Sequence, residues 1–175
     1  VMGRYAGWIA IESGIAGGAD VVLIPEIPID IEETCGLLKK RHARGKMFSI
    51  VVVAEGAKFK EETIVTQEQR LDEFGHVRLG GIGEILAGQI EKRTGYETRV
   101  SVLGHIQRGG TPSAFDRVLG TRFGIKAVEL VKNKKFGRMV ALAGNKIIDV
   151  PLEEATRELK TVDMELYEIA KVFFG

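Results

Sequence analysis

The chain has 175 residues, with 25 Lys or Arg and 24 Asp or Glu, and its formal net charge is +1. This length suffices for one domain with a sizeable core, or slightly more. Because the charges balance, we expect neither nucleic acid nor a membrane surface as a partner, and anions must be bound by local groups of side chains. The one cysteine, Cys35, cannot form an internal disulfide and is predicted to be structural. The sequence shows no signal peptide or long apolar run, which predicts a cytoplasmic protein.

The first part of the chain alternates helical and strand patterns. Residues 6–17 are small and apolar and predict a helix that packs on a sheet. The side expected to face the sheet carries Ile9, Ala10, Ser13 and Ala16. Residues 20–25 and 47–54 carry apolar side chains without alternation, which is typical of strands buried on both faces. Between them, acids early and bases late in 31–44 match a helix dipole, and Asp30 stands at the helix start.

The later part continues the alternation after a polar excursion. Residues 56–79 are polar and mixed, and two interpretations stay open, a lid or hairpin and a solvated decoration. Helical spacing resumes over 80–95 and again after Ser113, the predicted N-cap of a helix that ends at the basic residues 132–135. The remaining predicted elements are strands at 138–143 and 147–150 and helices opening at Pro151 and spanning 163–174. The alternation predicts an α/β fold with a mostly parallel sheet.

The stretch from Arg99 to Gly110 carries the most chemistry. Its β-branched run Val100–Leu103 predicts a buried strand that stops at a glycine, and ligands of open α/β sheets bind at the carboxyl ends of strands. Arg99, His105 and Arg108 suit a dianion such as a phosphate ester better than a metal or an acyl group. Alternatively, His105 is a hydrogen-bonded structural residue and the arginines are solvated charges.

Other sequence patterns support or limit this site. Glu55 follows the apolar run 47–54, where a carboxylate can accept hydrogen bonds from sugar hydroxyls. The sequence has no phosphate loop of the Gly-x-x-x-x-Gly-Lys type and no Gly-x-Gly-x-x-Gly turn, so a nucleotide site within it has little support. It also lacks zinc-ligand spacing and a Gly-x-Ser-x-Gly elbow.

Three motifs resemble the fructose 6-phosphate side of the 6-phosphofructokinase family. They are Met-Gly-Arg-Tyr-Ala-Gly at 2–7, Val-Ala-Glu-Gly at 53–56 and Leu-Gly-His-Ile-Gln-Arg-Gly-Gly-Thr-Pro at 103–112. They follow the family's order, and the resemblance covers essentially the whole chain. It implies a three-layer, Rossmann-like fold and a glycolytic enzyme. That enzyme transfers a phosphoryl group from ATP or pyrophosphate to the 1-hydroxyl of fructose 6-phosphate, with Mg²⁺ bound mainly alongside the donor.

The resemblance also implies a role for each matched residue. Arg4 is the catalytic candidate, placed to stabilise charge on the transferring group. Glu55 would bind sugar hydroxyls, and His105 and Arg108 would hold the 6-phosphate. Arg99 would reach the phosphate in a neighbouring subunit's site, which implies a homotetramer or dimer with shared sites. The implied substrate-binding residues are Met2, Gly3, Arg4, Glu55, Arg99, His105 and Arg108. The matched positions of the family's effector site are Gly18, Asp20, Arg44 and Lys46. No metal ligand is expected in this chain.

The same resemblance divides the chain and shows departures from the family pattern. Residues 1–107 would form a sugar-phosphate-binding domain that is incomplete at its N-terminus. Residues 108–158 would cross back to pack on a nucleotide domain, and 159–175 would form a C-terminal helix. The family's Thr-Ile-Asp catalytic motif and glycine-rich donor site do not occur in the sequence. We therefore expect a C-terminal half that is inactive alone, with the long excursion 56–79 resembling the mixed-substrate branch. The choice of donor is left open.

Two alternatives remain. One is a non-catalytic sugar-phosphate-binding or regulatory subunit, and the other is a structural α/β domain without a ligand.

Overall fold

The computed structural model describes residues 1–60 and 81–175, so most of the predicted excursion lies outside the described residues. The chain forms two compact units. The first contains Val1–Gln107 and Thr161–Gly175, and the second contains Arg108–Lys160. The second unit includes the predicted crossing segment 108–158, whose packing on a further domain stays a prediction.

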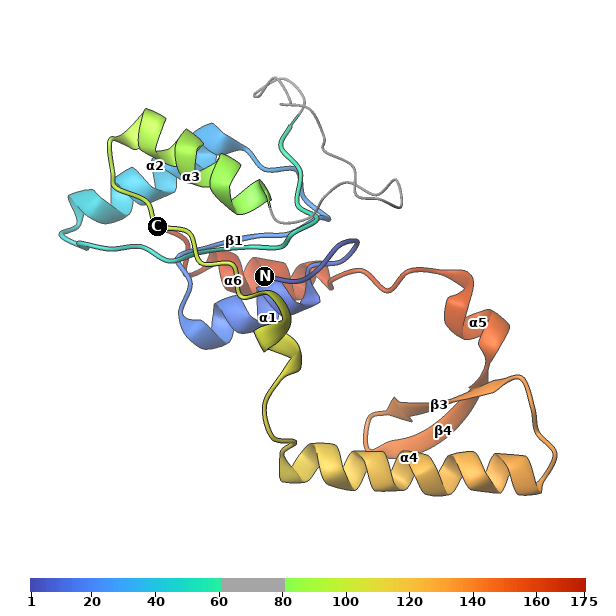
Figure 1. Cartoon of the computed structure of the whole chain (residues 1–175). Helices are drawn as coiled ribbons and strands as arrows, with labels where there is room; N and C mark the ends of the chain where they lie inside the picture. Colours follow the sequence, from blue (N-terminus) through green and yellow to red (C-terminus); the bar gives the residue numbers. More distant parts are fainter. Residues whose placement is uncertain (61–80) are drawn as a thin grey trace. The chain divides into compact units, whose positions relative to one another are not determined.

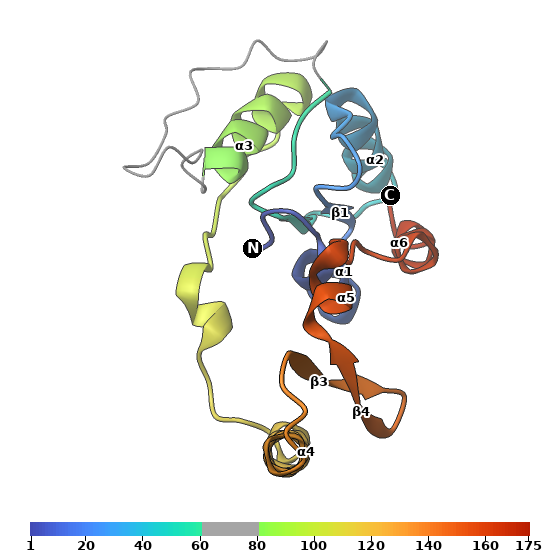
Figure 2. The same ribbon diagram turned by 90° about the vertical axis from the view of Figure 1, so that its right-hand side faces the viewer.

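The first unit is built around a parallel pair of strands, β1 (Val21–Leu23) and β2 (Val51–Val53). Helices cover both faces of this pair (Figures 1 and 2). On one face lie α2 (Ile31–Ala43) and α3 (Gly81–Thr94), and on the other lie α1 (Trp8–Gly17) and α6 (Met164–Lys171). The predicted three-layer α/β fold is confirmed by this arrangement.

Alternation of side chains along β1 divides the core into two clusters. Val22 packs in one cluster with residues of α1 and α6, such as Ile11 and Tyr167. Val21 and Leu23 point to the opposite face and pack with residues of α2 and α3. Successive side chains of a strand face opposite sides of the sheet, so a strand with apolar residues at every position can bury both layers.

The sheet-facing side of α1 differs from the prediction. Ala10, Ile11 and Gly14 are buried, whereas Ile9 is 44% exposed. A side chain at Gly14 would place its Cβ only 2.5 Å from a methyl group of Val22. Because Gly14 has no side chain, α1 can approach Val22 of β1 most closely there, and the side of α1 with Ala10, Ile11 and Gly14 faces β1. The predicted face, with Ser13 and Ala16, was therefore wrong apart from Ala10.

Glu26 joins the start of α1 to the segment that precedes α6. Its carboxylate accepts hydrogen bonds from the backbone N–H of Gly7, at 3.0 Å, and of Val162, at 2.9 Å. Gly7 is the N-cap of α1, whose first N–H groups lack helical partners. A carboxylate there is favourable, and it anchors the segment that leads into α6.

Two predicted strands are shorter or absent. The run 47–54 forms a strand only at Val51–Val53, and Met47 and Phe48 are 82% and 71% exposed. The run Val100–Leu103 forms no strand, and Val102 is 66% exposed. Residues of β2 and of this run both line a cavity of about 1090 Å³. An extended run without a neighbouring strand has no ladder partner, so its apolar residues do not become buried strand residues.

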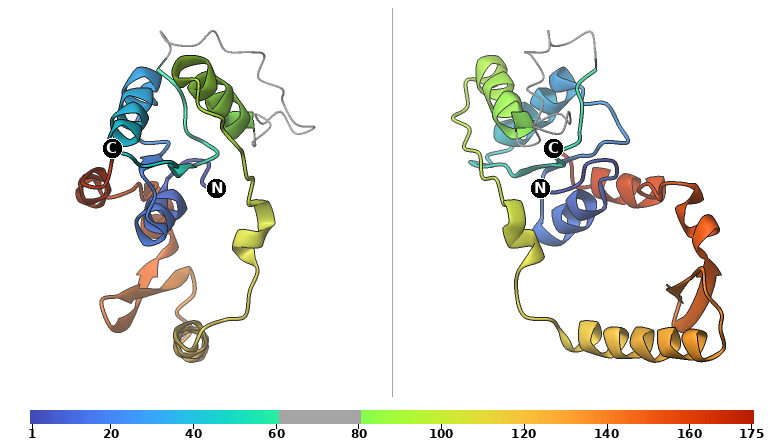
Figure 3. Two further views of the ribbon diagram at one scale, coloured as in Figure 1. Left: turned by 90° about the vertical axis from the view of Figure 1, so that its left-hand side faces the viewer. Right: turned by 45° about the vertical axis from the view of Figure 1, so that its right-hand side comes forward.

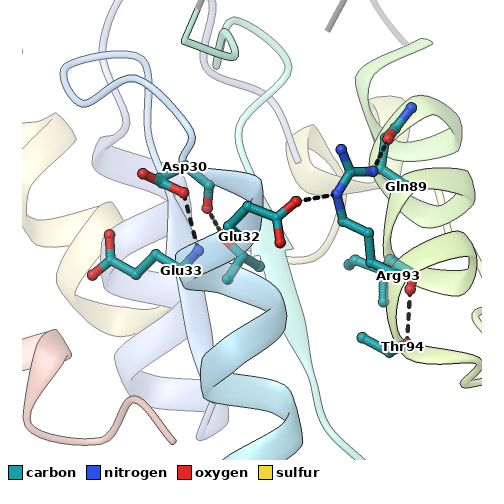
Figure 4. A network of polar contacts seen from close by, with 8 residues as sticks. Asp30, Glu32, Glu33, Gln89, Arg93 and Thr94 are labelled. Atoms are coloured by element: carbon teal, nitrogen blue, oxygen red, sulfur yellow. Dashed lines mark hydrogen bonds and ion pairs between the residues drawn. The ribbon is translucent and has the colours of Figure 1, made fainter. Parts of the chain in front are cut away.

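Polar contacts join α2 to α3, as Figure 4 shows. Arg93 donates from Nε to Glu32 Oε1 at 2.6 Å and also contacts Gln89. Asp30 is the N-cap of α2, as predicted, and accepts from the Glu33 N–H at 3.0 Å. The cap fixes where α2 begins and so places Glu32 within reach of α3.

The second unit packs one helix beside a hairpin (Figure 3). The helix α4 (Ala114–Lys132) begins with a capping box between Ser113 and Asp116, which confirms the predicted N-cap. The other elements of the second unit are β3 (Arg138–Ala143), β4 (Lys146–Pro151), which pairs antiparallel with β3, and α5 (Leu152–Arg157). Asp149 joins hairpin and helix, because it pairs with Lys126 at 3.1 Å and with Arg138.

In the described ranges, no helix is both long and apolar enough to cross a membrane.

Candidate functional site

The turn at Met2–Arg4 lies against the loop that follows β2. The N–H of Glu55 donates to the Val1 carbonyl at 2.9 Å, and the N–H of Gly56 donates to the Gly3 carbonyl at 3.0 Å. In return, the Gly3 N–H donates to Glu55 Oε1 at 3.4 Å. These bonds bring together two motifs that lie far apart in the sequence, at the carboxyl end of a parallel strand.

Glycine is required where the two segments meet. A Cβ at Gly56 would lie 1.9 Å from the carbonyl oxygen of Arg4, which is far inside any tolerable contact. Gly3 has a φ of 140°, and a Cβ there would lie 2.8 Å from the Ala6 carbonyl oxygen. The backbone around Arg4 is thus held at a close approach that only glycine permits.

The third motif forms a short 3₁₀-helix, η1 (Gly104–Arg108). His105 and Arg108 are exposed and, at three residues per turn, share one face of η1. Gln107 is half-buried, and its Oε1 accepts from the Met2 N–H at 3.0 Å. Its Nε2 donates to the Gly104 carbonyl at 2.9 Å. The Met2 turn and η1 are therefore hydrogen-bonded to each other.

The chemistry offered by this group is that of an anion site. Arg4 and His105 are exposed and able to meet a ligand, and Glu55 is half-buried beside the Gly3 amide. Arginine and histidine suit phosphate oxygens, and a carboxylate suits hydroxyl donors. Across residues 1–60 and 81–175, no three His, Cys, Asp or Glu side chains gather as a metal site would require.

The other predicted site residues have different surroundings. Arg99 pairs with Glu97 at 2.8 Å, and its side chain is 87% exposed. Arg108 ends η1 and is the first residue of the second unit. The structure thus brings Met2, Gly3 and Glu55 together with η1, and Arg99 points into solvent in the single chain.

The four predicted effector positions are not one group of free side chains. Asp20 is 5% exposed, pairs with Arg41 at 2.9 Å and accepts from the Ile50 N–H at 2.7 Å. Its carboxylate therefore sets where β2 begins. Gly18 is the left-handed C-cap of α1, Arg44 is the C-cap of α2, and Lys46 is exposed. An effector role for these positions stays a prediction.

Two residues that shape the site could not be assigned a role from the sequence. Gly56 belongs to the motif at 53–56, but only the structure shows its contact with the Arg4 carbonyl. Gln107 stands between His105 and Arg108, and an uncharged side chain beside two cations gives no signal of its own. The bond from Gln107 to Met2 spans 105 positions, which local spacing cannot indicate.

Comparison with known proteins adds an independent line of evidence. Residues 1–131 match the family model described as phosphofructokinase. The chain is 59% identical over 175 residues to a pyrophosphate–fructose 6-phosphate 1-phosphotransferase of Streptomyces coelicolor. It is 54% identical over 175 residues to an ATP-dependent 6-phosphofructokinase of Mycobacterium tuberculosis. Both alignments cover 100% of this chain and 51% of the relative, so the chain spans about half the length of these curated relatives.

Solved structures give the same result. Phosphofructokinase of Pichia pastoris matches with a TM-score of 0.72 and 33% identity over 99% of this chain and 18% of that chain. Pyrophosphate-dependent phosphofructokinase of Marinobacter aquaeolei matches with a TM-score of 0.73 and 26% identity, covering 94% of this chain and 41% of that one. With the three motifs joined at the end of β2, these matches show that the chain belongs to the phosphofructokinase family.

Proposed function

We propose that this chain forms the fructose 6-phosphate-binding part of a 6-phosphofructokinase. Such an enzyme transfers a phosphoryl group from ATP or pyrophosphate to the 1-hydroxyl of fructose 6-phosphate and yields fructose 1,6-bisphosphate. The observation that carries the proposal is the hydrogen-bonded series from Glu55 through Gly3 and Met2 to Gln107. It assembles the three motifs that the sequence alone could only place in order.

Each side chain has a distinct task in this proposal. His105 and Arg108, on one face of η1, bind the 6-phosphate dianion, because charge-assisted hydrogen bonds to phosphate are among the strongest in proteins. Glu55 accepts hydrogen bonds from sugar hydroxyls. Arg4 stabilises the negative charge that builds up on the transferring phosphoryl group. The group that accepts the proton of the 1-hydroxyl is not among these residues.

Mg²⁺ is the metal expected with the phosphoryl donor in this reaction. It binds through carboxylates, water and substrate phosphates in an octahedral arrangement. In the described part of the chain, no cluster of carboxylates or histidines fits such an ion, and Glu55 is the one proposed carboxylate ligand, assigned to the sugar. We therefore assign no step of the reaction to a metal held by these residues.

The exposed position of Arg99 fits the proposal that it acts in a neighbouring subunit's site. A guanidinium that is 87% exposed and paired only at the surface gains little from that pair. It is therefore available to a phosphate supplied by another copy of the chain. The proposed assembly is a dimer or tetramer with shared sites.

The test is the exchange Arg108→Ala in the complete gene product, assayed with both ATP and pyrophosphate. A lost charged hydrogen bond to phosphate should raise the KM for fructose 6-phosphate about 10- to 100-fold. The KM for the donor should not change. Arg157→Ala, which removes an exposed arginine at the end of α5, is the matched control and should behave like the wild type. An unchanged KM for fructose 6-phosphate in Arg108→Ala would refute the site assignment.

A further inference from the structure

Gln107 uses both ends of its side-chain amide. Its Oε1 accepts the Met2 N–H at 3.0 Å, and its Nε2 donates to the Gly104 carbonyl at 2.9 Å. The second bond joins residues three apart, as the turn of a 3₁₀-helix places them. The side chain is half-buried, so these bonds are partly shielded from competition by water.

The helix that carries His105 and Arg108 has little stability of its own. It has five residues, none of them buried, and the bond from the Ile106 N–H to the Leu103 carbonyl is 3.3 Å long. Short 3₁₀ segments have poor hydrogen-bond geometry, and the preceding run 100–103 forms no strand that could hold it. The orientation of η1 therefore depends on contacts with other segments.

Gln107 supplies such a contact at Met2, the first residue of the turn that bears Arg4. Met2 is continuous with Gly3, whose N–H and carbonyl are both bonded to the loop after β2. The strand β2 is fixed in the core, so Gln107 ties η1 through Met2 to the rigid sheet. A carboxylate at this position could accept from Met2, but it could not donate to the Gly104 carbonyl and would oppose a nearby phosphate.

We propose that Gln107 is a positioning residue for sugar-phosphate binding. It bonds η1, which carries His105 and ends at Arg108, to the turn that bears Arg4. The helix η1 is then ordered before the sugar phosphate binds, so binding does not have to offset the entropy cost of ordering it. This inference rests on the proposed function, because it needs His105 and Arg108 as phosphate ligands.

The test compares Gln107→Ala and Gln107→Met with the wild type in the complete gene product. Methionine keeps the volume of the side chain and removes both hydrogen bonds. Each variant should raise the KM for fructose 6-phosphate about tenfold, which corresponds to about one hydrogen-bonded anchor. The KM for the donor and the thermal unfolding midpoint should stay near the wild-type values. Gln107→Glu, which keeps only the bond to Met2, should not restore wild-type KM.

A double-mutant cycle with Arg108→Ala separates positioning from a general effect on folding. If Gln107 acts through Arg108, its replacement should add little to the KM already raised by Arg108→Ala. The inference would be overturned by fully additive effects on KM, by a wild-type KM in both Gln107 variants, or by loss of folding in both Gln107 variants. A raised KM in Arg108→Ala beside a wild-type KM in the Gln107 variants would refute this inference alone. An unchanged KM in Arg108→Ala would refute the proposed function itself.

Discussion

At the scale of single residues, the site depends on backbone contacts as much as on charged side chains. The Gly56 N–H bonds the Gly3 carbonyl, and the Gly56 Cα faces the Arg4 carbonyl at a distance that leaves no room for a Cβ. The motif residues Glu55, His105 and Arg108 could be selected from the sequence because their chemistry is visible there. The contacts through Gly56 and Gln107 could not, since they join segments from distant parts of the chain.

Gly56→Ala should damage the site without removing any charged group. The added Cβ would lie 1.9 Å from the Arg4 carbonyl oxygen, so the turn with Arg4 must shift. We expect kcat/KM for fructose 6-phosphate to fall about tenfold or more, since small displacements of catalytic groups are costly. Steady-state kinetics of the complete gene product measure this effect.

Gly88→Ala is the matched control for that exchange. Gly88 lies within α3, and a Cβ there meets no atom within 4 Å. Alanine favours a helix over glycine by roughly 0.5–1 kcal/mol, so stability should rise and activity should not change. Equal kinetics for the Gly56 and Gly88 variants would contradict the close approach at Arg4.

At the scale of secondary structure, helices were more predictable than strands. Asp30 and Ser113 begin α2 and α4 as predicted, because a cap is a local bond between a side chain and an N–H three residues later. A strand exists only beside a partner, so the apolar run 100–103 could not reveal that no ladder forms there. The face of α1 was mispredicted because the approach of Val22 to Gly14 is a tertiary contact.

The cap of α2 predicts a pH dependence of stability. The Glu33 N–H, and then the Lys60 ammonium, hold the pKa of Asp30 below its ordinary value of 3.8. A carboxyl with a lower pKa in the folded state stabilises the fold above its ordinary pKa. This stabilisation is lost as the pH falls through the folded-state pKa. Below about pH 4, the wild type should therefore lose stability that a non-titrating side chain would not lose.

Asp30→Asn isolates this contribution, because asparagine also caps helices but carries no charge. Urea midpoints at pH 7 and pH 3 should differ less in this variant than in the wild type. Part of the dependence should remain, since hydrogen bonds also lower the pKa of Asp116 and of Asp149. An equal loss of stability in the variant and the wild type would show that Asp30 titrates alike in the folded and unfolded states.

At the scale of the whole molecule, β1 unites the two core clusters of the first unit. Trp8 packs against the cluster of α1 and α6, and Cys35 lies in the cluster of α2 and α3. They are the one tryptophan and the one cysteine of the chain, so each reports on its own side of the sheet. Because Val21, Val22 and Leu23 contribute to both clusters, we expect the first unit to unfold as one.

Modification of the Cys35 thiol measures whether the first unit unfolds as one. It is 2% exposed, and burial raises the pKa of its thiol, so a thiol reagent should not modify it in the folded protein. With increasing urea, its modification should begin at the concentration at which Trp8 fluorescence changes. Modification before the change in fluorescence would mean that the two helical layers unfold separately.

The proposed function requires that η1, bonded through Gln107 to the turn at Met2, recognises the phosphate of a sugar phosphate. Calorimetric titration of the complete gene product, with fructose 6-phosphate and with fructose in parallel, tests this claim most directly. We predict saturable binding of fructose 6-phosphate, competition by inorganic phosphate and no binding of fructose at the same concentrations. Binding without turnover with either donor would favour the non-catalytic binding subunit. Equal binding of the two sugars, or binding of neither, would contradict the assignment of these residues to a sugar-phosphate site.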